Sequence, residues 1–227
     1  MKIELDLTFN IKVGNDIRKA VADGWPIQSA IASDLRSGFW HCGHELFKTT
    51  PDTYRVPFIE GDAYDDSFLS PVPLRAPNSE VPIPDVALDK IKTLNELHHK
   101  VSAIHASAFF HLFPEERQLD LARRLVSLLL PKKGSIIFGE HVSLPEKGFR
   151  AQMTEMKAHD WRMFCHDPES WENMWVNEVF AGSGIEIKVD ARLIPVQRRD
   201  LEALSQQYSQ CTEELRFWIM RWSITIL

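Results

Sequence analysis

Short apolar runs alternate along the chain with longer stretches in which apolar residues recur every three or four positions. The first pattern is typical of buried strands and the second of helices that cover a sheet. We expect strands over residues 1–13, 29–34, 56–62, 101–106, 135–139, 185–196 and 215–227. We expect helices over residues 16–23, 39–47, 88–97, 114–129, 168–180 and 200–210. Because helices separate most of the strands, the pattern predicts an α/β fold with a mainly parallel sheet covered on both faces.

A few residues mark the ends of these elements. Asn15 is placed to cap the first helix and Gly24 to end it. Pro114 suits the first turn of the helix that follows the fourth strand. The buried face of that helix would carry Leu119, Ala122, Val126 and Leu129. Residues 71–84 are rich in proline and predict a loop, which is the best candidate for an insertion or for one edge of an active site.

Length and charge narrow the class of protein. The 227 residues fit one domain, residues 1–227, with a substantial core. The formal net charge of -6 argues against nonspecific attachment to nucleic acid or to an anionic membrane, so we expect neither as a partner. The widely spaced Cys42, Cys165 and Cys211 predict reduced thiols rather than a disulfide framework or a zinc site. The amino terminus lacks the pattern of a signal peptide and no apolar run approaches the roughly 20 residues of a membrane helix, so we expect a cytoplasmic protein.

Two acidic residues follow apolar stretches that are typical of successive buried strands. Asp34 comes after the stretch 29–32, and Asp62 follows the next predicted strand. In open α/β sheets ligands bind outside the carboxyl ends of the strands, where a carboxylate can accept hydrogen bonds from a ribose diol. Aspartate after a strand is also common turn chemistry, so each residue by itself leaves both roles open. Together the two positions favour a cofactor that carries a nucleoside.

Several segments of the chain resemble a single family when they are taken together. They are DIRK (16–19), SDLRSGFW (33–40), GDAY (61–64), IHASAFFHLF (104–113), GSIIFG (134–139), PEKGFR (145–150) and MFCHDPESW (163–171). The combined pattern resembles the class I S-adenosylmethionine-dependent methyltransferases of fungal secondary metabolism, a group that includes enzymes of terpenoid and meroterpenoid pathways. The resemblance extends from about residue 13 to the carboxyl end of the chain.

The resemblance implies a Rossmann-like fold, with a mostly parallel seven-stranded sheet whose last strand is antiparallel, and S-adenosyl-L-methionine as the cofactor. The positions that match the cofactor side of the family are Gly14, Asp34, Leu35, Asp62, Ala63, Ala106 and Ser107. By this resemblance Asp34 would receive the ribose hydroxyls, and Asp62 and Ala63 would lie by the adenine. Ala106 and Ser107 would face the methionine portion and the substrate.

The chain departs from the family's pattern in two places. Family members usually carry an Asp-Leu-Gly-Cys-Cys-like loop after the first strand, whereas this chain has TFNIKVG over residues 8–14, with Thr8 in place of the acidic residue. Only Gly14 keeps a glycine, which lets the backbone approach a ligand and adopt positive φ. Family members also carry a helical segment before the first strand, and this chain starts almost at that strand. We expect the pocket there to be open, or to be covered by a second copy of the chain or by another partner.

Histidines supply the remaining candidates for chemistry. His111 lies a few residues beyond Ser107, close to where a substrate would enter, and is the candidate general base. A histidine near a strand end, such as His105, more often has a structural role. The spacing of His98, His99 and His105 repeats no known ligand pattern, so we expect no metal site.

Aromatic residues bear on the substrate. Five tryptophans could either pack in the core or sheet or line a substrate pocket, and packing is the favoured role. They are Trp161, Trp171, Trp175, Trp218 and Trp222. Aromatic enrichment nevertheless suits an apolar small-molecule substrate. The leading hypothesis is methyl transfer from S-adenosylmethionine to an oxygen, hydroxyl or carboxylate, of a small apolar secondary metabolite. The loop over residues 8–14, which keeps only one glycine of the family's pattern, motivates a second hypothesis, a methyltransferase-like cyclase or isomerase. The third hypothesis is a noncatalytic paralogue that stabilises another protein.

Overall fold

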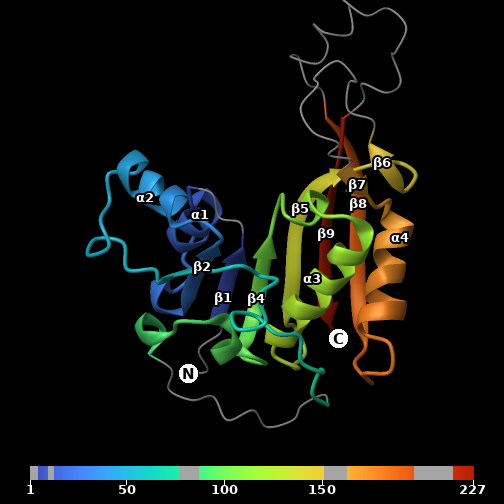
Figure 1. Cartoon of the computed structure of the whole chain (residues 1–227), viewed down its shortest axis with the longest axis horizontal. Helices are drawn as coiled ribbons and strands as arrows, with labels where there is room; N and C mark the ends of the chain where they lie inside the picture. The colour runs from blue at the N-terminus through green and yellow to red at the C-terminus, as the bar shows by residue number, and fades with distance from the viewer. Residues whose placement is uncertain (1–4, 10–12, 77–86, 151–162, 197–216) are drawn as a thin grey trace, which may run out of the picture.

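A seven-stranded sheet organises the chain in a computed structural model that describes residues 5–9, 13–76, 87–150, 163–196 and 217–227. The strands lie in the order β3, β2, β1, β4, β5, β9, β8 (Figure 1). Their bounds are β1 (Leu5–Phe9), β2 (Ala30–Asp34), β3 (Phe58–Glu60), β4 (Val101–Ala106), β5 (Ile136–Ser143), β8 (Ile187–Val196) and β9 (Phe217–Ile226). Pairing is parallel from β3 across to β5, and β9 is antiparallel to both of its neighbours. The predicted Rossmann-like sheet, mostly parallel with an antiparallel last strand, is confirmed.

The remaining elements connect and cover this sheet. The α-helices are α1 (Asn15–Ala22), α2 (Ser37–Leu46), α3 (Glu115–Leu128) and α4 (Pro168–Asn173), which continues into the π-helix η5 (Met174–Val179). The 3₁₀-helices are η1 (Ile27–Ser29), η2 (Leu88–Lys90), η3 (Leu94–Leu97) and η4 (Phe110–Leu112). The strands β6 (Gly148–Arg150) and β7 (Met163–Cys165) form a separate antiparallel pair. The helix predicted at 200–210 lies outside the described residues, as do residues 77–84 of the predicted loop.

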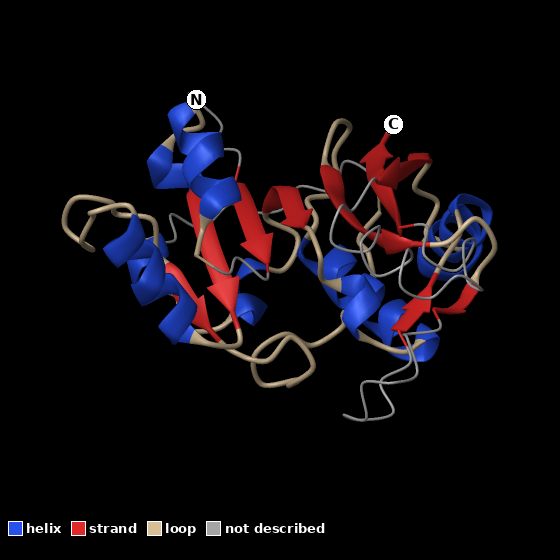
Figure 2. Cartoon of the chain, turned by 90° about the horizontal axis from the view of Figure 1, so that it is seen from above, coloured by secondary structure: helices blue, strands red, loops and turns tan. Residues whose placement is uncertain are grey.

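Two apolar clusters lie on opposite faces of the sheet, because successive residues of a strand point to opposite sides. On β2, Ala30 and Ala32 belong to the smaller cluster together with Ile17 of α1 and Trp40 of α2. Ile31, between those alanines, belongs to the larger cluster, which includes residues of α3, α4 and η5. Figure 2 shows the helices gathered in two groups, one beside each half of the sheet. The predicted covering of both faces is confirmed.

Some predicted boundaries are wrong for identifiable reasons. Gly14 rather than Asn15 is the N-cap of α1, because Gly14 takes the left-handed φ of 79° and Asn15 is already helical. The single helix expected over 88–97 is replaced by η2 and η3, with extended backbone between them. Leu94 and Leu97 are both fully buried, and a spacing of three residues fits one 3₁₀ turn.

The arrangement of the strands decides where a ligand can bind. The parallel strands β1, β2, β3 and β4 all end at the same edge of the sheet, so the loops that follow them meet there. β5 runs on to Ser143, past its predicted end, because its whole length pairs with β9.

None of the helices in the described ranges combines the length and the apolar composition needed to cross a membrane.

Candidate functional site

A pocket opens at the carboxyl ends of β1, β2 and β3. Its volume is about 330 Å³, and its lining includes Asp34, Leu35, Asp62, Ala63, Tyr64 and Phe109. The first four of these are among the positions that the family resemblance predicts for the cofactor, with Asp34 at the ribose and Asp62 and Ala63 by the adenine. Because ligands of open α/β sheets bind in this crevice, the structure brings the predicted residues together where a nucleoside would bind.

Hydrogen bonds between the ends of β2 and β3 hold the floor of this pocket. Gly61 N donates to Asp34 O at 3.1 Å, and Ser33 Oγ donates to Ile59 O at 2.9 Å. Gly61 leaves room for the ring of Phe68, because a Cβ at this position would lie 2.3 Å from that ring. Any larger residue at position 61 would therefore force either the ring of Phe68 or the turn that carries Asp62 to shift.

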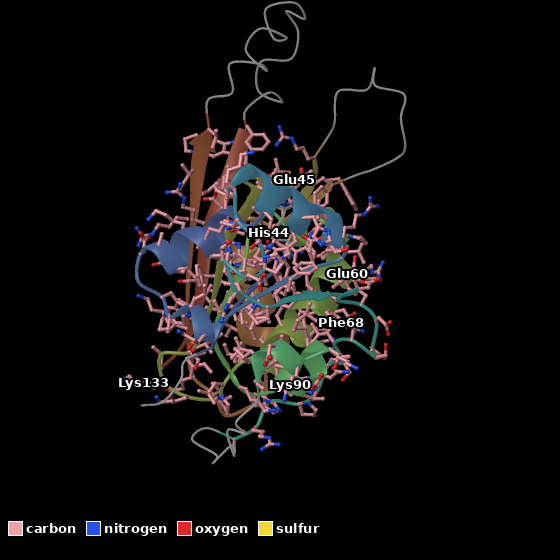
Figure 3. The ribbon with its side chains drawn as sticks, turned by 90° about the vertical axis from the view of Figure 1, so that its left-hand side faces the viewer. His44, Glu45, Glu60, Phe68, Lys90 and Lys133 are labelled. Atoms are coloured by element: carbon pink, nitrogen blue, oxygen red, sulfur yellow. The ribbon has the colours of Figure 1, made fainter. Side chains whose placement is uncertain are left out.

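The turn between β2 and α2 is fixed by carboxylates. Asp34 Oδ1 accepts from Arg36 N at 3.0 Å. Glu60, at the end of β3, accepts from Ser37 N at 2.8 Å and so ties β3 to the start of α2. This backbone bond lowers the pKa of the exposed Glu60 carboxyl below its ordinary value. Figure 3 shows Glu60 beside the helix that carries His44 and Glu45.

Asp62, like Asp34, accepts a hydrogen bond from the backbone N–H two residues later in the chain. Its Oδ1 accepts from Tyr64 N at 2.9 Å. The turn role and the ligand role are compatible for both Asp34 and Asp62, since an ionised carboxylate has about four acceptor sites. The local hydrogen bonds therefore orient both carboxylates.

Aromatic rings form much of the wall of the pocket. Tyr64 and Phe113 meet edge to face with centroids 4.9 Å apart, and the centroid of Phe109 lies 5.5 Å from that of Phe113. Phe9 stacks on Phe109 at 6.1 Å. The guanidinium of Arg117 lies 4.0 Å from the ring centre of Tyr64, whose hydroxyl donates to Arg117 O at 2.7 Å. Burial raises the pKa of Tyr64, so its phenol is neutral, and the wall offers apolar surface to a flat ring.

These wall residues are not among the site residues predicted from the sequence. Phe109 and Phe113 lie in the segment IHASAFFHLF, and its match to the family was the feature of the sequence that could have identified them. Arg117 lies on α3 and reaches the pocket only through the fold.

The other predicted cofactor positions lie outside the lining of this pocket. Gly14 requires glycine for two reasons: its φ is 79°, and a Cβ would lie 2.8 Å from the ring of Trp40. Ala106 is fully buried at the end of β4. Ser107, the next residue, lines a second cavity. Residues 10–12, which join β1 to Gly14, lie outside the described residues.

The second cavity lies beside β4, β5, β8 and β9 and has a volume of about 690 Å³. Its lining includes Asp16, His105, Ser107, Phe138, Glu140 and Arg221. An ion pair of 2.9 Å joins Glu140 on β5 to Arg221 on β9. Since Ser107 lines this cavity and Phe109 lines the first, the short segment after β4 separates the two.

His111 lies next to Leu112, which lines the first cavity. It is in η4, 9% exposed, and its ring centroid is 6.3 Å from that of His141. His141 is buried, and its Nδ1 accepts from Trp222 Nε1 at 2.9 Å. In the part of the chain that the structure describes, His111 is in the lining of neither cavity, and its role as a base stays a prediction.

The tryptophans of the carboxyl-terminal half pack in the core. Trp171 and Trp175 are fully buried, and Trp222 is nearly so. The ring centroids of Trp171 and Trp222 are 5.0 Å apart. The predicted packing role is confirmed for Trp171 and Trp175, whereas Trp222 packs in the core and also contributes to the lining of the second cavity. Trp161 lies outside the described ranges.

The described cysteines are in the lining of neither cavity. Cys42 is an exposed free thiol and Cys165 a buried one, whose pKa burial raises to about 11. Cys211 lies outside the described residues. Within the described ranges, histidine, cysteine, aspartate and glutamate form no group of three or more that is arranged to hold a metal ion.

Sequence comparison gives relatives among fungal methyltransferases, although no family model matches the chain. O-methyltransferase phiE from Fungal sp. is 28% identical over 180 residues, which are 79% of this chain and 50% of that protein. Methyltransferase adrK of Penicillium rubens is 27% identical over 78% of this chain and 53% of its own length. Asnovolin E/Chermesin D methyltransferase nvfJ of Aspergillus novofumigatus is also 27% identical, over 77% of this chain and 53% of its own length. The chain thus spans about half the length of these relatives.

Structural comparison supports the fold. A putative S-adenosylmethionine-dependent methyltransferase from Listeria monocytogenes has a TM-score of 0.56 at 8% identity, covering 99% of this chain and 92% of that one. The [4+2]-cyclase SpnF has a TM-score of 0.52 at 12% identity, covering 99% and 76%. The fold is therefore shared by proteins with different chemistry. The chain is therefore similar in sequence to fungal methyltransferases, and it shares its fold with S-adenosylmethionine-dependent methyltransferases.

Proposed function

We propose that this chain transfers a methyl group from S-adenosylmethionine to an oxygen of a small apolar metabolite. The observation that carries the proposal is the pocket in which Asp34 and Asp62 share a lining with aromatic rings. The named relatives support it, because they are methyltransferases and phiE is named an O-methyltransferase. The relatives are about twice as long, so extending their activity to this chain is part of the proposal.

The first pocket fits the nucleoside half of the cofactor. Asp34 would accept hydrogen bonds from the ribose hydroxyls, and Asp62 would lie by the adenine. The rings of Tyr64 and Phe109 offer the apolar surface that a purine needs. A volume of about 330 Å³ lies within the range of small-molecule pockets.

Positioning is what the chain has to contribute to the reaction. S-adenosylmethionine, when bound, supplies a methyl group that its sulfonium has already activated. The protein then has to hold the acceptor oxygen in line with that methyl group and exclude water. Asp16 lines the second cavity, and its negative charge favours a cation there. Since buried Thr8 replaces the family's acidic residue, Asp16 is the candidate for this charge.

A methyl-transfer assay tests the proposal. The chain would be incubated with methyl-labelled S-adenosylmethionine and two apolar acceptors of matched shape, 2-naphthol and 2-naphthoic acid. We expect labelled product from the unmodified chain and from Asp52→Ala, which alters an exposed residue outside both cavities. Asp34→Ala should abolish the product at low cofactor concentration. Cofactor binding without transfer to either acceptor would contradict the proposal and favour the cyclase or isomerase hypothesis.

A further inference from the structure

Helix α2 carries apolar side chains on two faces, and one of these faces is exposed. Trp40 and Gly43 lie on the buried face, where Trp40 joins residues of α1 and β2 in the smaller cluster. The other face carries Phe39, Cys42 and Leu46, whose spacing of three and four residues places them on one side of the helix. Phe39 is 46% and Leu46 62% exposed, and Cys42 is exposed as well.

The exposed face continues at both ends of the helix. Leu35, shortly before α2, is 58% exposed, and Phe47, directly after it, is 41% exposed. Four of the seven large apolar side chains that are exposed in the described ranges fall between Leu35 and Phe47. We call Leu35, Phe39, Cys42, Leu46 and Phe47 the α2 stripe, and Figure 1 shows α2 at the outer edge of the fold. An exposed apolar patch of this kind marks an interaction surface.

The order of residues in the α2 stripe makes it complementary to itself. Cys42 lies near the midpoint between Phe39 and Leu46 along the helix. A two-fold axis beside Cys42 places Phe39 of each copy against Leu46 of the other, with the two small thiols between these large pairs. Such a contact uses the same surface on both copies and closes after two. We propose that this chain forms a dimer in which the two α2 helices pack antiparallel through the α2 stripe.

The polar residues beside the stripe fit the same arrangement. His41 and Glu45 are both exposed on one flank of the stripe, and neither forms an ion pair within the described residues. In the antiparallel pair Glu45 of one copy is level with His41 of the other, so an imidazole N–H can donate to a carboxylate on each side of the axis. Antiparallel packing also brings the positive start of each helix beside the negative end of the other.

The exposed area matches the need of a weak, specific dimer. A large side chain offers about 200 Å² when fully exposed, so the four large side chains of the stripe expose roughly 400 Å². Two copies would bury about 800 Å² of apolar surface, which is the apolar share of an interface of roughly 1,200–1,400 Å². This size lies at the low end of specific interfaces, so we expect a dissociation constant in the micromolar range.

The place of the stripe gives the dimer a relation to the first pocket. Leu35 and Phe39 belong both to the stripe and to the lining of that pocket, so the second copy borders its opening. The sequence leaves open whether a second copy or another partner covers a pocket of this chain, and the symmetry of the stripe favours the second copy. The dimer does not depend on the proposed function.

Sedimentation velocity of the full chain under reducing conditions tests the dimer. Across the micromolar range, the sedimentation coefficient should rise from that of a monomer to that of a dimer and no further. Leu46→Glu should raise the dissociation constant at least about 10-fold, because it buries a carboxylate of each copy against a phenylalanine ring. Val176→Glu adds the same charge at another exposed apolar residue, in η5, and should change the constant by no more than about twofold.

Crosslinking identifies the surface through which the copies meet. In a Cys211→Ser background the remaining thiols are the exposed Cys42 and the buried Cys165. A short bis-maleimide should join two copies, because each Cys42 thiol adds to one maleimide double bond. Cys42→Ser in the same background should abolish the covalent dimer, and Leu46→Glu should reduce its yield.

Several results would overturn the dimer. A chain that stays monomeric at the highest concentration contradicts it, and so does growth beyond two copies, which a closed two-fold contact forbids. A dimer that Leu46→Glu leaves intact, or that gives no crosslink through Cys42, uses another surface. Circular dichroism checks that Leu46→Glu is folded, and the Cys42 crosslink decides if it is not. Binding of S-adenosylhomocysteine, measured separately, bears on the proposed function alone.

Discussion

Trp222 and Trp175 form a matched pair for measuring one buried hydrogen bond. Their side chains are 4% and 0% exposed, and their ring centroids lie 6.4 Å apart in the same cluster. Trp222 Nε1 donates to His141 Nδ1 at 2.9 Å, whereas Trp175 Nε1 has no hydrogen-bond partner in the described residues. Replacing each with phenylalanine removes the same atoms, so the difference between the variants isolates the hydrogen bond.

The structure sets the expected size of that difference. Trp222→Phe leaves His141 Nδ1 buried without its donor, and burial holds the pKa of His141 far below neutrality, so protonation gives no relief. A buried acceptor left unsatisfied costs about 1–3 kcal/mol. Trp175→Phe removes a donor that has no acceptor and costs only packing. We therefore expect the free energy of unfolding of Trp222→Phe to lie about 1–3 kcal/mol below that of Trp175→Phe.

Urea denaturation followed by far-ultraviolet circular dichroism measures both free energies. The slopes of the two transitions should agree, since the variants expose similar surface on unfolding. Thermal unfolding should show the same order, with about 2–4 °C for each kcal/mol in a chain of this size. A Trp175→Phe variant as unstable as Trp222→Phe would refute the reasoning, because the bond to His141 would then contribute nothing.

Further predictions concern titration, the backbone and the pocket wall. Burial lowers the pKa of His166 to about 4 from 6.5, so the unfolded chain binds more protons between these values. The free energy of unfolding should therefore fall as pH drops from 6.5 to 4, by about 3 kcal/mol for this group, and denaturation of His166→Gln across that range should show a smaller fall. Gly14→Ala should lower the free energy of unfolding by at least about 1 kcal/mol, because Gly14 has a positive φ. Gly38→Ala lies in α2 with open space around the added Cβ, so it should leave this free energy unchanged or raise it by about 0.5 kcal/mol. Thermal unfolding compares the two variants. Tyr64→Phe keeps the ring and should bind S-adenosylhomocysteine within about twofold of the unmodified chain, while Tyr64→Ala should weaken calorimetric binding about tenfold.

The strand ends were predictable because their signal is local. Ala30, Ile31 and Ala32 are all apolar and precede Asp34, and the structure buries all of them before the chain turns. A strand with no polar face has to be covered on both sides, and its first charged residue then marks the edge of the sheet. In the next strand that residue is Glu60, and Asp62 lies in the turn that follows it.

The walls of the site were not predictable, because they depend on contacts between distant segments. Tyr64 meets Phe113 and Arg117 only after α3 has packed on the sheet. His105 alternates with core residues in its strand, and nothing in that pattern reveals its bond to Ser107. The prediction of one helix over 88–97 was wrong because, over a short segment, the three-residue spacing of a 3₁₀-helix cannot be told from the three-to-four-residue spacing of an α-helix.

Calorimetric titration with S-adenosylhomocysteine tests whether the first pocket binds the nucleoside half of S-adenosylmethionine. Every step of the proposed function depends on that binding. We expect micromolar binding by the unmodified chain, about -8 kcal/mol. Asp34→Ala should weaken it by about 1.5–3 kcal/mol, and Asp52→Ala should leave it unchanged. A folded sample that does not bind, or an Asp34→Ala variant that binds as tightly as the unmodified chain, would contradict the assignment of this pocket.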